Sequence, residues 1–249
     1  MSIMQSVGKP ADRQSIITIC GDAGMGKTSL AATFPKPIFI RAEDGLQAIP
    51  EDSRPDAFPV LTSVDDLLAQ LQALVTEQHD YKTVVIDSVT ALERMFMQYV
   101  IESDPKKPKS INQALGGYGA GWAAVGSLHQ RVRKAAGLMV NKGMFVVFVA
   151  HADTETIELP DSDPYTRYSL RLNKKSIAAY VDEVDLVGFL RLVTFTTGDG
   201  ERKKAISNGD RALVTYATAA NVSKNRYRIK EDLPVVIGKN PLSGIVPNL

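Results

Sequence analysis

The chain has 249 residues, of which 44% are hydrophobic, and it carries a formal net charge of +1. It can bury a full core, and its length allows one α/β domain or two small ones, of which we expect one. A near-neutral chain has no global attraction to nucleic acid, so such binding must come from local clusters of lysine and arginine. Cys20 is the only cysteine, which excludes an internal disulfide and a zinc cluster built on paired cysteines.

The N-terminal residues 1–14 mix Ser, Gln, Gly, Lys, Pro and Asp, and they lack the apolar core of a secretory signal. We expect them to form a flexible arm, or a segment that docks on a neighbouring subunit, before a single domain at residues 15–249. No uninterrupted apolar stretch is long enough to cross a bilayer. We therefore expect a cytoplasmic protein with no membrane partner.

Apolar runs of strand length alternate with segments of helical spacing through the first 150 residues. Strands are predicted at 16–20, 37–41, 83–87 and 144–150, and helices at 29–33, 67–78, 90–102 and 122–140. The two long connections at 103–121 and 152–170 are predicted to be loops.

The C-terminal third has a different pattern. A helix is predicted at 173–181, followed by hairpin strands at 185–197, 203–207 and 212–217 with a turn at 198–200. Strands that alternate with helices predict an α/β fold with a mostly parallel central sheet, flanking helices and antiparallel edge strands near the C-terminus.

The segment directly after the first predicted strand has the spacing G-x-x-x-x-G-K-T, which is typical of a phosphate-binding loop. It supplies glycine backbone that can approach phosphate oxygens, and Lys27 to reach the β and γ phosphates of ATP. Thr28 is predicted to offer its hydroxyl to Mg²⁺. The alternative is a flexible turn that has this spacing by chance, but the predicted strand before it and the predicted helix after it disfavour that alternative. The predicted nucleotide contacts are Gly21, Asp22, Ala23, Gly24, Met25, Gly26, Lys27, Thr28 and Ser29.

Polar residues follow three other predicted strands, at the sheet edge where an open parallel sheet binds its ligand. Glu43 is predicted to polarise the water that attacks the γ phosphate, and Asp87 to hold Mg²⁺ directly or through water. His151 is placed to hydrogen-bond the γ phosphate and sense its loss.

Each of these three residues has a structural alternative. Asp87 could be only a helix N-cap, and His151 a satisfied polar residue at a strand end. Glu43 could be a solvated loop residue, with Asp44 as the competing carboxylate.

The segments FIRAE at 39–43 and VIDSVTAL at 85–92, with the apolar strand that ends in a polar residue, resemble the RecA-like recombinase core. The resemblance spans roughly residues 15–230 and implies a RecA-like P-loop fold with Glu43 as catalytic base. That family usually has glutamine as its γ-phosphate sensor, where this chain has His151.

The segment at 222–226 resembles a basic-Asn-basic segment of bacterial recombinases that reaches the neighbouring subunit's γ phosphate. The resemblance implies that Lys224 and Arg226 act in trans, in a homo-oligomer, filament or ring, with ATP at the interface. An exposed basic edge strand is the alternative. The sequence SKNRY at 223–227, with the early phosphate loop, is similar to phage-encoded RecA-like single-strand annealing proteins.

In RecA-like proteins, the loops after the third-strand helix and after the sensor strand hold single-stranded DNA. The resemblance places these loops at 103–121 and 152–170. The first has glycines for mobility, lysines for phosphate contacts and a tyrosine for base stacking, and the second has arginines beside several carboxylates. The predicted DNA contacts are Lys106, Lys107, Lys109, Tyr118, Arg167 and Arg171. Solvated surface loops are the alternative in both places.

These observations predict a DNA-stimulated ATPase that binds single-stranded DNA and promotes annealing or strand exchange in phage recombination, in the bacterial host cytoplasm. A single-stranded DNA-binding protein is a further candidate partner. The rival is a nucleotide-switched interaction module, such as a helicase-loader-like regulatory ATPase, with the same ATP site and no DNA contacts. A small-molecule kinase is disfavoured, because no arginine-rich lid is visible in the sequence.

Overall fold

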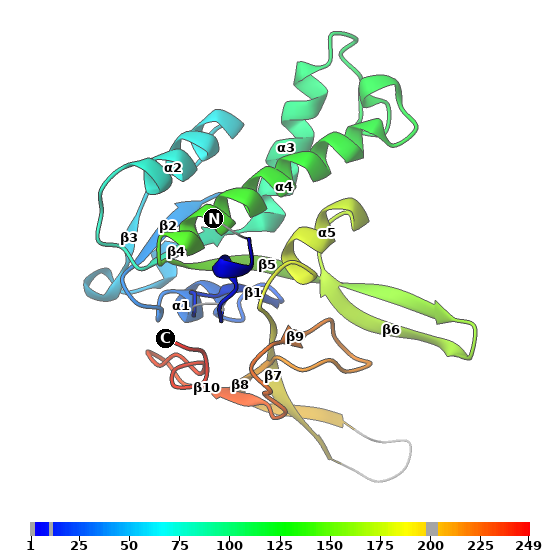
Figure 1. The fold of residues 1–249 in the computed structure, drawn as a ribbon. Helices are drawn as coiled ribbons and strands as arrows, with labels where there is room; N and C mark the ends of the chain where they lie inside the picture. Colours follow the sequence, from blue (N-terminus) through cyan, green and yellow to red (C-terminus); the bar gives the residue numbers. More distant parts are fainter. Residues whose placement is uncertain (1–2, 10–11, 198–203) are drawn as a thin grey trace.

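The computed structural model describes residues 3–9, 12–197 and 204–249, and within them one large sheet runs through the protein (Figure 1). Its strands are β1 (Ile16–Gly21), β2 (Pro37–Arg41), β3 (Asp56–Ala57), β4 (Thr83–Asp87), β5 (Phe145–Leu159), β6 (Ser162–Leu170), β7 (Leu186–Thr197), β8 (Lys204–Val214), β9 (Lys224–Asn225) and β10 (Leu233–Val235). The main path of the sheet is β10-β8-β7-β1-β5-β4-β2-β3, while β6 pairs with β5 and β9 pairs with β7.

The helices lie between these strands along the chain. They are α1 (Lys27–Ala31), α2 (Val64–Thr76), α3 (Val89–Ser103), α4 (Ala120–Asn141) and α5 (Lys174–Val181), with short 3-10 helices η1 (Ile3–Ser6), η2 (Leu46–Ala48), η3 (Glu51–Ser53) and η4 (Ala114–Gly116). The central strands β7, β1, β5, β4, β2 and β3 pair in parallel, while β8, β9 and β10 pair antiparallel. The predicted fold class is therefore confirmed.

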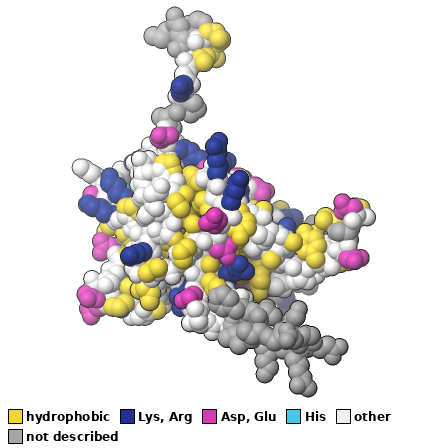
Figure 2. Space-filling view, turned by 90° about the horizontal axis from the view of Figure 1, so that it is seen from below, with side chains coloured by type: hydrophobic (Ala, Val, Ile, Leu, Met, Phe, Trp, Pro, Cys, Tyr) yellow, Lys and Arg dark blue, Asp and Glu magenta, His cyan; other side chains and the backbone are white. Residues whose placement is uncertain are grey.

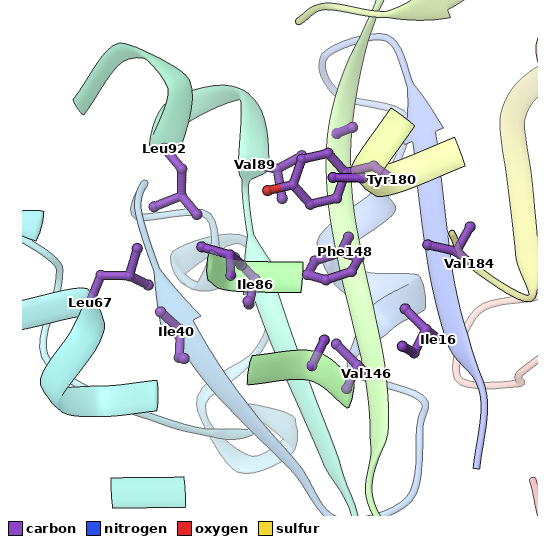
Figure 3. Close-up of a cluster of buried hydrophobic side chains, with 14 of the residues drawn as sticks. Ile16, Ile40, Leu67, Ile86, Val89, Leu92, Val146, Phe148, Tyr180 and Val184 are labelled. Carbon is purple, nitrogen blue, oxygen red and sulfur yellow. The ribbon is translucent and has the colours of Figure 1, made fainter. Parts of the chain in front are cut away.

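The two faces of the sheet bury different side chains, because successive strand residues point to opposite sides. On one face Ile16, Ile86 and Phe148 pack under α2 to α5 (Figure 3). On the other face Ile17, Val85 and Val147 pack with α1 and with C-terminal residues between 229 and 249. Because both faces are covered, these strands are apolar throughout, which is why the sequence predicted them well.

Two sequence predictions are wrong. Residues 152–170 form a β-hairpin, in which β5 continues past His151 and pairs with β6. Residues 203–207 and 212–217 were expected to be separate strands, but β8 is continuous across most of this region. In both places, polar residues on exposed strands were mistaken for connections. The turn expected at 198–200 lies outside the described residues.

The face of the molecule drawn in Figure 2 carries side chains of both charges, in line with the near-neutral composition. Dark blue and magenta side chains are interspersed over the face drawn in Figure 2 and form no large patch of one sign. Near the N-terminus, Ile3, Met4 and Val7 are largely exposed. No helix in the described part of the chain combines the length and the apolar character needed to cross a membrane.

Candidate functional site

The register of the sheet brings the predicted strand-end residues to one edge. Gly21 of β1 lies opposite His151 of β5, and Asp87 of β4 lies opposite Val149, two residues before that histidine. On the other side of β4, Asp87 lies opposite Arg41, the last residue of β2, so Glu43 follows at the same edge. The carboxyl ends of four parallel strands therefore meet at one place, where open α/β sheets bind ligands.

The phosphate loop between β1 and α1 requires glycine at two positions. Gly24 and Gly26 have φ angles of 75° and 87°, which are left-handed values that other residues adopt only with strain. Lys27 is buried, and its Nζ donates hydrogen bonds to the carbonyl oxygens of Gly21, at 2.9 Å, and Asp22, at 2.8 Å. Burial lowers the pKa of Lys27. The lysine is therefore held within its own loop, where phosphate oxygens could replace these carbonyls.

Two oxygen donors suited to Mg²⁺ meet beside this loop. Thr28 Oγ1 donates a hydrogen bond of 2.7 Å to Asp87 Oδ2, and burial raises the pKa of Asp87. A Cβ at Gly45 would lie 3.1 Å from Thr28 Oγ1 and 3.4 Å from Asp87 Oδ2, so the backbone packs closely against this pair. In the described part of the chain, no three His, Cys, Asp or Glu side chains form a metal-binding group. The hydroxyl and the carboxylate fit a Mg²⁺ ion that also takes phosphate oxygens as ligands.

Ser88, and not Asp87, is the N-cap of α3. Its Oγ accepts a hydrogen bond of 3.2 Å from the backbone N–H of Ala91. The alternative in which Asp87 is merely a helix cap is therefore wrong, and the Asp87 carboxylate stays directed at Thr28.

Glu43 is held by residues from two other strand ends. Its Oε1 accepts a hydrogen bond from Ser88 Oγ and lies 3.1 Å from Nε2 of His151, whose Nδ1 is 3.5 Å from Nζ of Lys27. These partners fit a neutral imidazole that donates from Nε2 and accepts at Nδ1. The hydrogen bond from His151, with a second from Ser88, lowers the pKa of Glu43 to about 2 despite partial burial. The competing carboxylate, Asp44, is instead 3.1 Å from Nη1 of Arg41.

The low pKa of Glu43 can be tested on the protein without nucleotide. Replacing His151 with alanine removes the largest stabilising contact of the carboxylate, so we expect the pKa of Glu43 to rise toward its ordinary value. A ¹³C NMR titration of the carboxyl groups measures this shift, with Asp44 as the internal control. An unchanged pKa of Glu43 in His151→Ala would show that the hydrogen bond does not control its ionisation.

The two cations predicted to act in trans are engaged within their own chain. Lys224 Nζ donates to the carbonyl oxygens of Val181, at 3.3 Å, and Asp182, at 2.5 Å. Arg226 Nη1 lies 3.0 Å from Oδ1 of Asp185. Lys224 lies on β9, which pairs with β7, and Arg226 follows that strand. Their action on a neighbouring subunit stays a prediction.

The predicted DNA contacts lie on two projections. Residues 104–119 connect α3 to α4 at the far end of that helix pair, and the β5–β6 hairpin extends elsewhere (Figure 1). On the hairpin, Arg167 Nε is 2.8 Å from Oε1 of Glu155, and Arg171 Nε is 4.0 Å from Oδ2 of Asp153. The hairpin arginines are therefore partly neutralised by their own neighbours. On the other projection, Lys106, Lys107, Lys109 and Tyr118 are exposed.

The structure also brings to the phosphate loop a residue that the sequence did not indicate. A side chain at Gly26 would collide with Nη1 of Arg211, which lies on β8. Arg211 belongs to no recognisable sequence motif. It lies beside the phosphate loop only because β8 pairs with β7. Glu43, Asp87 and His151 lie beside the phosphate loop. Lys224, Arg226 and the predicted residues on the two projections have no described contact with that loop.

Comparisons with known proteins find a family model, a curated relative and a solved structure that are similar to this chain. A family model described as AAA domain matches residues 13–227. The SPbeta prophage-derived uncharacterized protein YorG of Bacillus subtilis (strain 168) is 27% identical over 202 residues, which are 78% of this chain and 54% of that protein. The chain thus spans about half the length of this curated relative. Among solved structures, a KaiC-like protein from Pyrococcus horikoshii OT3 superimposes with a TM-score of 0.49 and has 14% sequence identity. The superposition covers 91% of this chain and 87% of the KaiC-like chain.

Proposed function

This chain belongs to the AAA domain family, and from that premise we propose that it is an ATPase that binds single-stranded DNA and promotes annealing or strand exchange. The observation that carries the ATPase proposal is the position of Glu43, whose carboxylate is fixed by Ser88 and His151 beside the phosphate loop. The prophage-derived relative supports a link to phages, and the role that we propose is in phage recombination. The proposed site of action is the cytoplasm of a bacterial host.

In the proposed reaction, Lys27 exchanges its two loop carbonyls for phosphate oxygens of ATP. Mg²⁺, held by Thr28 and Asp87, would neutralise phosphate charge. The hydrogen bonds from Ser88 and His151 both use Oε1 of Glu43, so Oε2 can accept one from the attacking water. A carboxylate with a pKa of about 2 is a weak base, and its main contribution is therefore to orient that water.

The proposed DNA contact is the loop at 104–119, which has local order despite its length. Asp104 is buried, and its carboxylate accepts hydrogen bonds from the backbone N–H groups of Lys106, at 2.9 Å, and Leu115, at 2.6 Å. The aromatic ring of Tyr118 is fully exposed. The ammonium groups of the three exposed lysines in this loop have no carboxylate oxygen within 4 Å among the described residues. Such a loop offers charge for phosphates and a ring for base stacking.

We further propose a homo-oligomer, filament or ring, in which Lys224 and Arg226 approach the neighbour's ATP. They would first have to leave the carbonyls and the carboxylate that they contact in this chain. A single-stranded DNA-binding protein is a candidate additional partner.

The DNA proposal is tested by changing Lys106, Lys107 and Lys109 together to glutamine. We expect weaker binding of single-stranded DNA in the presence of Mg²⁺ and an ATP analogue. The slope of log affinity against log salt should fall by up to about 2, since each phosphate contact on a single strand contributes about 0.7. The matched control changes three exposed lysines elsewhere, Lys142, Lys230 and Lys239. ATP turnover is measured with and without DNA for every variant.

Two outcomes would overturn this part of the proposal. If wild-type protein binds no single-stranded DNA in any nucleotide state, DNA is not its ligand. If the loop variant binds DNA with the wild-type affinity and salt slope, the loop is not the contact. The first outcome, with ATP binding retained, would favour a nucleotide-switched interaction module.

A further inference from the structure

The side chain of Arg211 lies on the same face of the sheet as the phosphate loop. In the β7–β8 pair, Leu190 lies opposite Leu213 and Leu192 lies opposite Arg211. Leu190 and Leu213 are buried with Leu30 of α1. Side chains two residues apart on a strand share a face, so Arg211 points to the α1 side as well. Because Leu190 also lies opposite Gly21, Arg211 is level with the loop that begins there.

A bulge in β8 sets this register. Ser207 lies opposite Thr194 and Arg211 opposite Leu192, so residues 208–210 stand opposite the single residue Val193. Gly209 has a φ angle of 88°, and the backbone N–H of Asp210 donates a 3.1 Å hydrogen bond to Oδ1 of Asn208. Bulges redirect side chains and are common beside active sites. Without the bulge, Gly209 would be opposite Leu192, and no guanidinium would reach the loop.

The guanidinium of Arg211 contacts the last glycine of the phosphate loop. Any side chain at Gly26 would collide with Nη1 of Arg211, and Gly26 directly precedes Lys27. No carboxylate lies within 4 Å of this guanidinium in the described part of the chain. By contrast, Arg191 of the adjacent strand lies 2.8 Å from Oδ2 of Asp232. Arg211 therefore brings a second cation, with donors suited to phosphate oxygens, to the loop that Lys27 serves.

The order of the strands shows from which side this cation approaches the phosphate loop. Glu43, Asp87 and His151 follow β2, β4 and β5, which all lie on one side of β1. Arg211 comes from β8, on the opposite side of β1, beyond β7. It therefore approaches the loop from the side away from the residues assigned to the γ phosphate.

We propose that Arg211 is a nucleotide-binding residue, whose guanidinium contacts the α and β phosphates common to ATP and ADP. The inference rests on the proposed ATPase function. Because Arg211 and the phosphate loop belong to the same chain, this contact forms in the monomer and does not depend on assembly. It contributes about equally to the binding of ATP and of ADP.

The test compares Arg211→Ala with Arg191→Ala by titration calorimetry with Mg²⁺-ADP and a non-hydrolysable Mg²⁺-ATP analogue. Loss of one charged hydrogen-bonding group should weaken the binding of both nucleotides by about 10- to 100-fold in Arg211→Ala. The affinity of Arg211→Ala for pyrophosphate should fall by a similar factor. Arg191→Ala should keep the wild-type affinities and the wild-type turnover at saturating ATP. Arg211→Gln, of similar size, replaces alanine if thermal melting shows that Arg211→Ala is unfolded.

The possible failures are distinguishable. Wild-type protein that binds neither nucleotide overturns the proposed ATPase function itself. ADP and pyrophosphate affinities that are unchanged in Arg211→Ala overturn this inference and leave the ATPase proposal intact. Weaker binding of the ATP analogue alone places the guanidinium on the γ phosphate and overturns the assignment to α and β.

Discussion

Replacing Lys27 with alanine is expected to abolish ATP binding and, with it, ATP hydrolysis and ATP-dependent DNA binding. The lysine is buried at the start of α1, and its ammonium contacts His151 and the Gly21 and Asp22 carbonyls. Among the described residues, no other ammonium or guanidinium group hydrogen-bonds to these atoms. We expect ATP turnover to fall by at least about 10²- to 10³-fold relative to the wild type, because that is the cost of removing one fixed group that stabilises transition-state charge.

The control for this variant is Lys36→Ala, which removes an exposed lysine whose Nζ lies 2.5 Å from Oδ2 of Asp80. It removes the same charge without touching the phosphate loop, and should leave nucleotide affinity unchanged. Thermal melting without nucleotide checks that Lys27→Ala is folded. If folded Lys27→Ala bound ATP as the wild type does, the loop at 21–28 would not be the nucleotide site.

Replacing Glu43 with glutamine is expected to stop hydrolysis while ATP binding persists. The amide keeps the shape of the carboxylate and an oxygen that Ser88 and His151 can contact, but it lacks the negative charge with which Glu43 orients and polarises the attacking water. We expect turnover to fall by about 10²- to 10³-fold, the cost of removing one fixed group that stabilises transition-state charge. The protein should then accumulate in its ATP-bound assembly, which sedimentation with ATP and single-stranded DNA would detect.

The neighbouring carboxylate provides the matched control. Asp44 precedes Gly45 in the same loop, but it pairs with Arg41 and has no described contact with His151 or Ser88. Asp44→Asn should hydrolyse ATP at nearly the wild-type rate. Normal turnover in Glu43→Gln with slow turnover in Asp44→Asn would transfer the role to Asp44.

The sequence predicted the parts of the site that depend on local pattern. Buried parallel strands are continuous apolar runs, so their ends, and hence the positions of Asp87 and His151, could be located without a structure. The glycine spacing of residues 21–28 likewise located the phosphate loop from the sequence alone. The contact between Glu43 and His151 joins residues 108 apart, and only the parallel register of β2, β4 and β5 brings them together.

The features that were missed depend on pairing between exposed strands. The hairpin of β5 and β6 has polar residues on both faces, and cross-strand pairs such as Glu155 with Arg167 help to hold it. Acidic and threonine-rich segments of this kind have no apolar period that a sequence can reveal. Arg211 was missed for a related reason, because a bulge sets its register and no motif marks it.

The continuity of β5 has a mechanical consequence. His151 and Leu159 belong to one uninterrupted strand, with no hinge loop between the phosphate edge and the end of the hairpin. At about 3.3 Å per residue, the far end lies roughly 26 Å from the histidine. A tilt of about 5° at His151 would therefore swing the far end by about 2 Å on a strand of that length. A small tilt of β5 beside the phosphate loop is therefore amplified into a larger displacement at the far end of the hairpin.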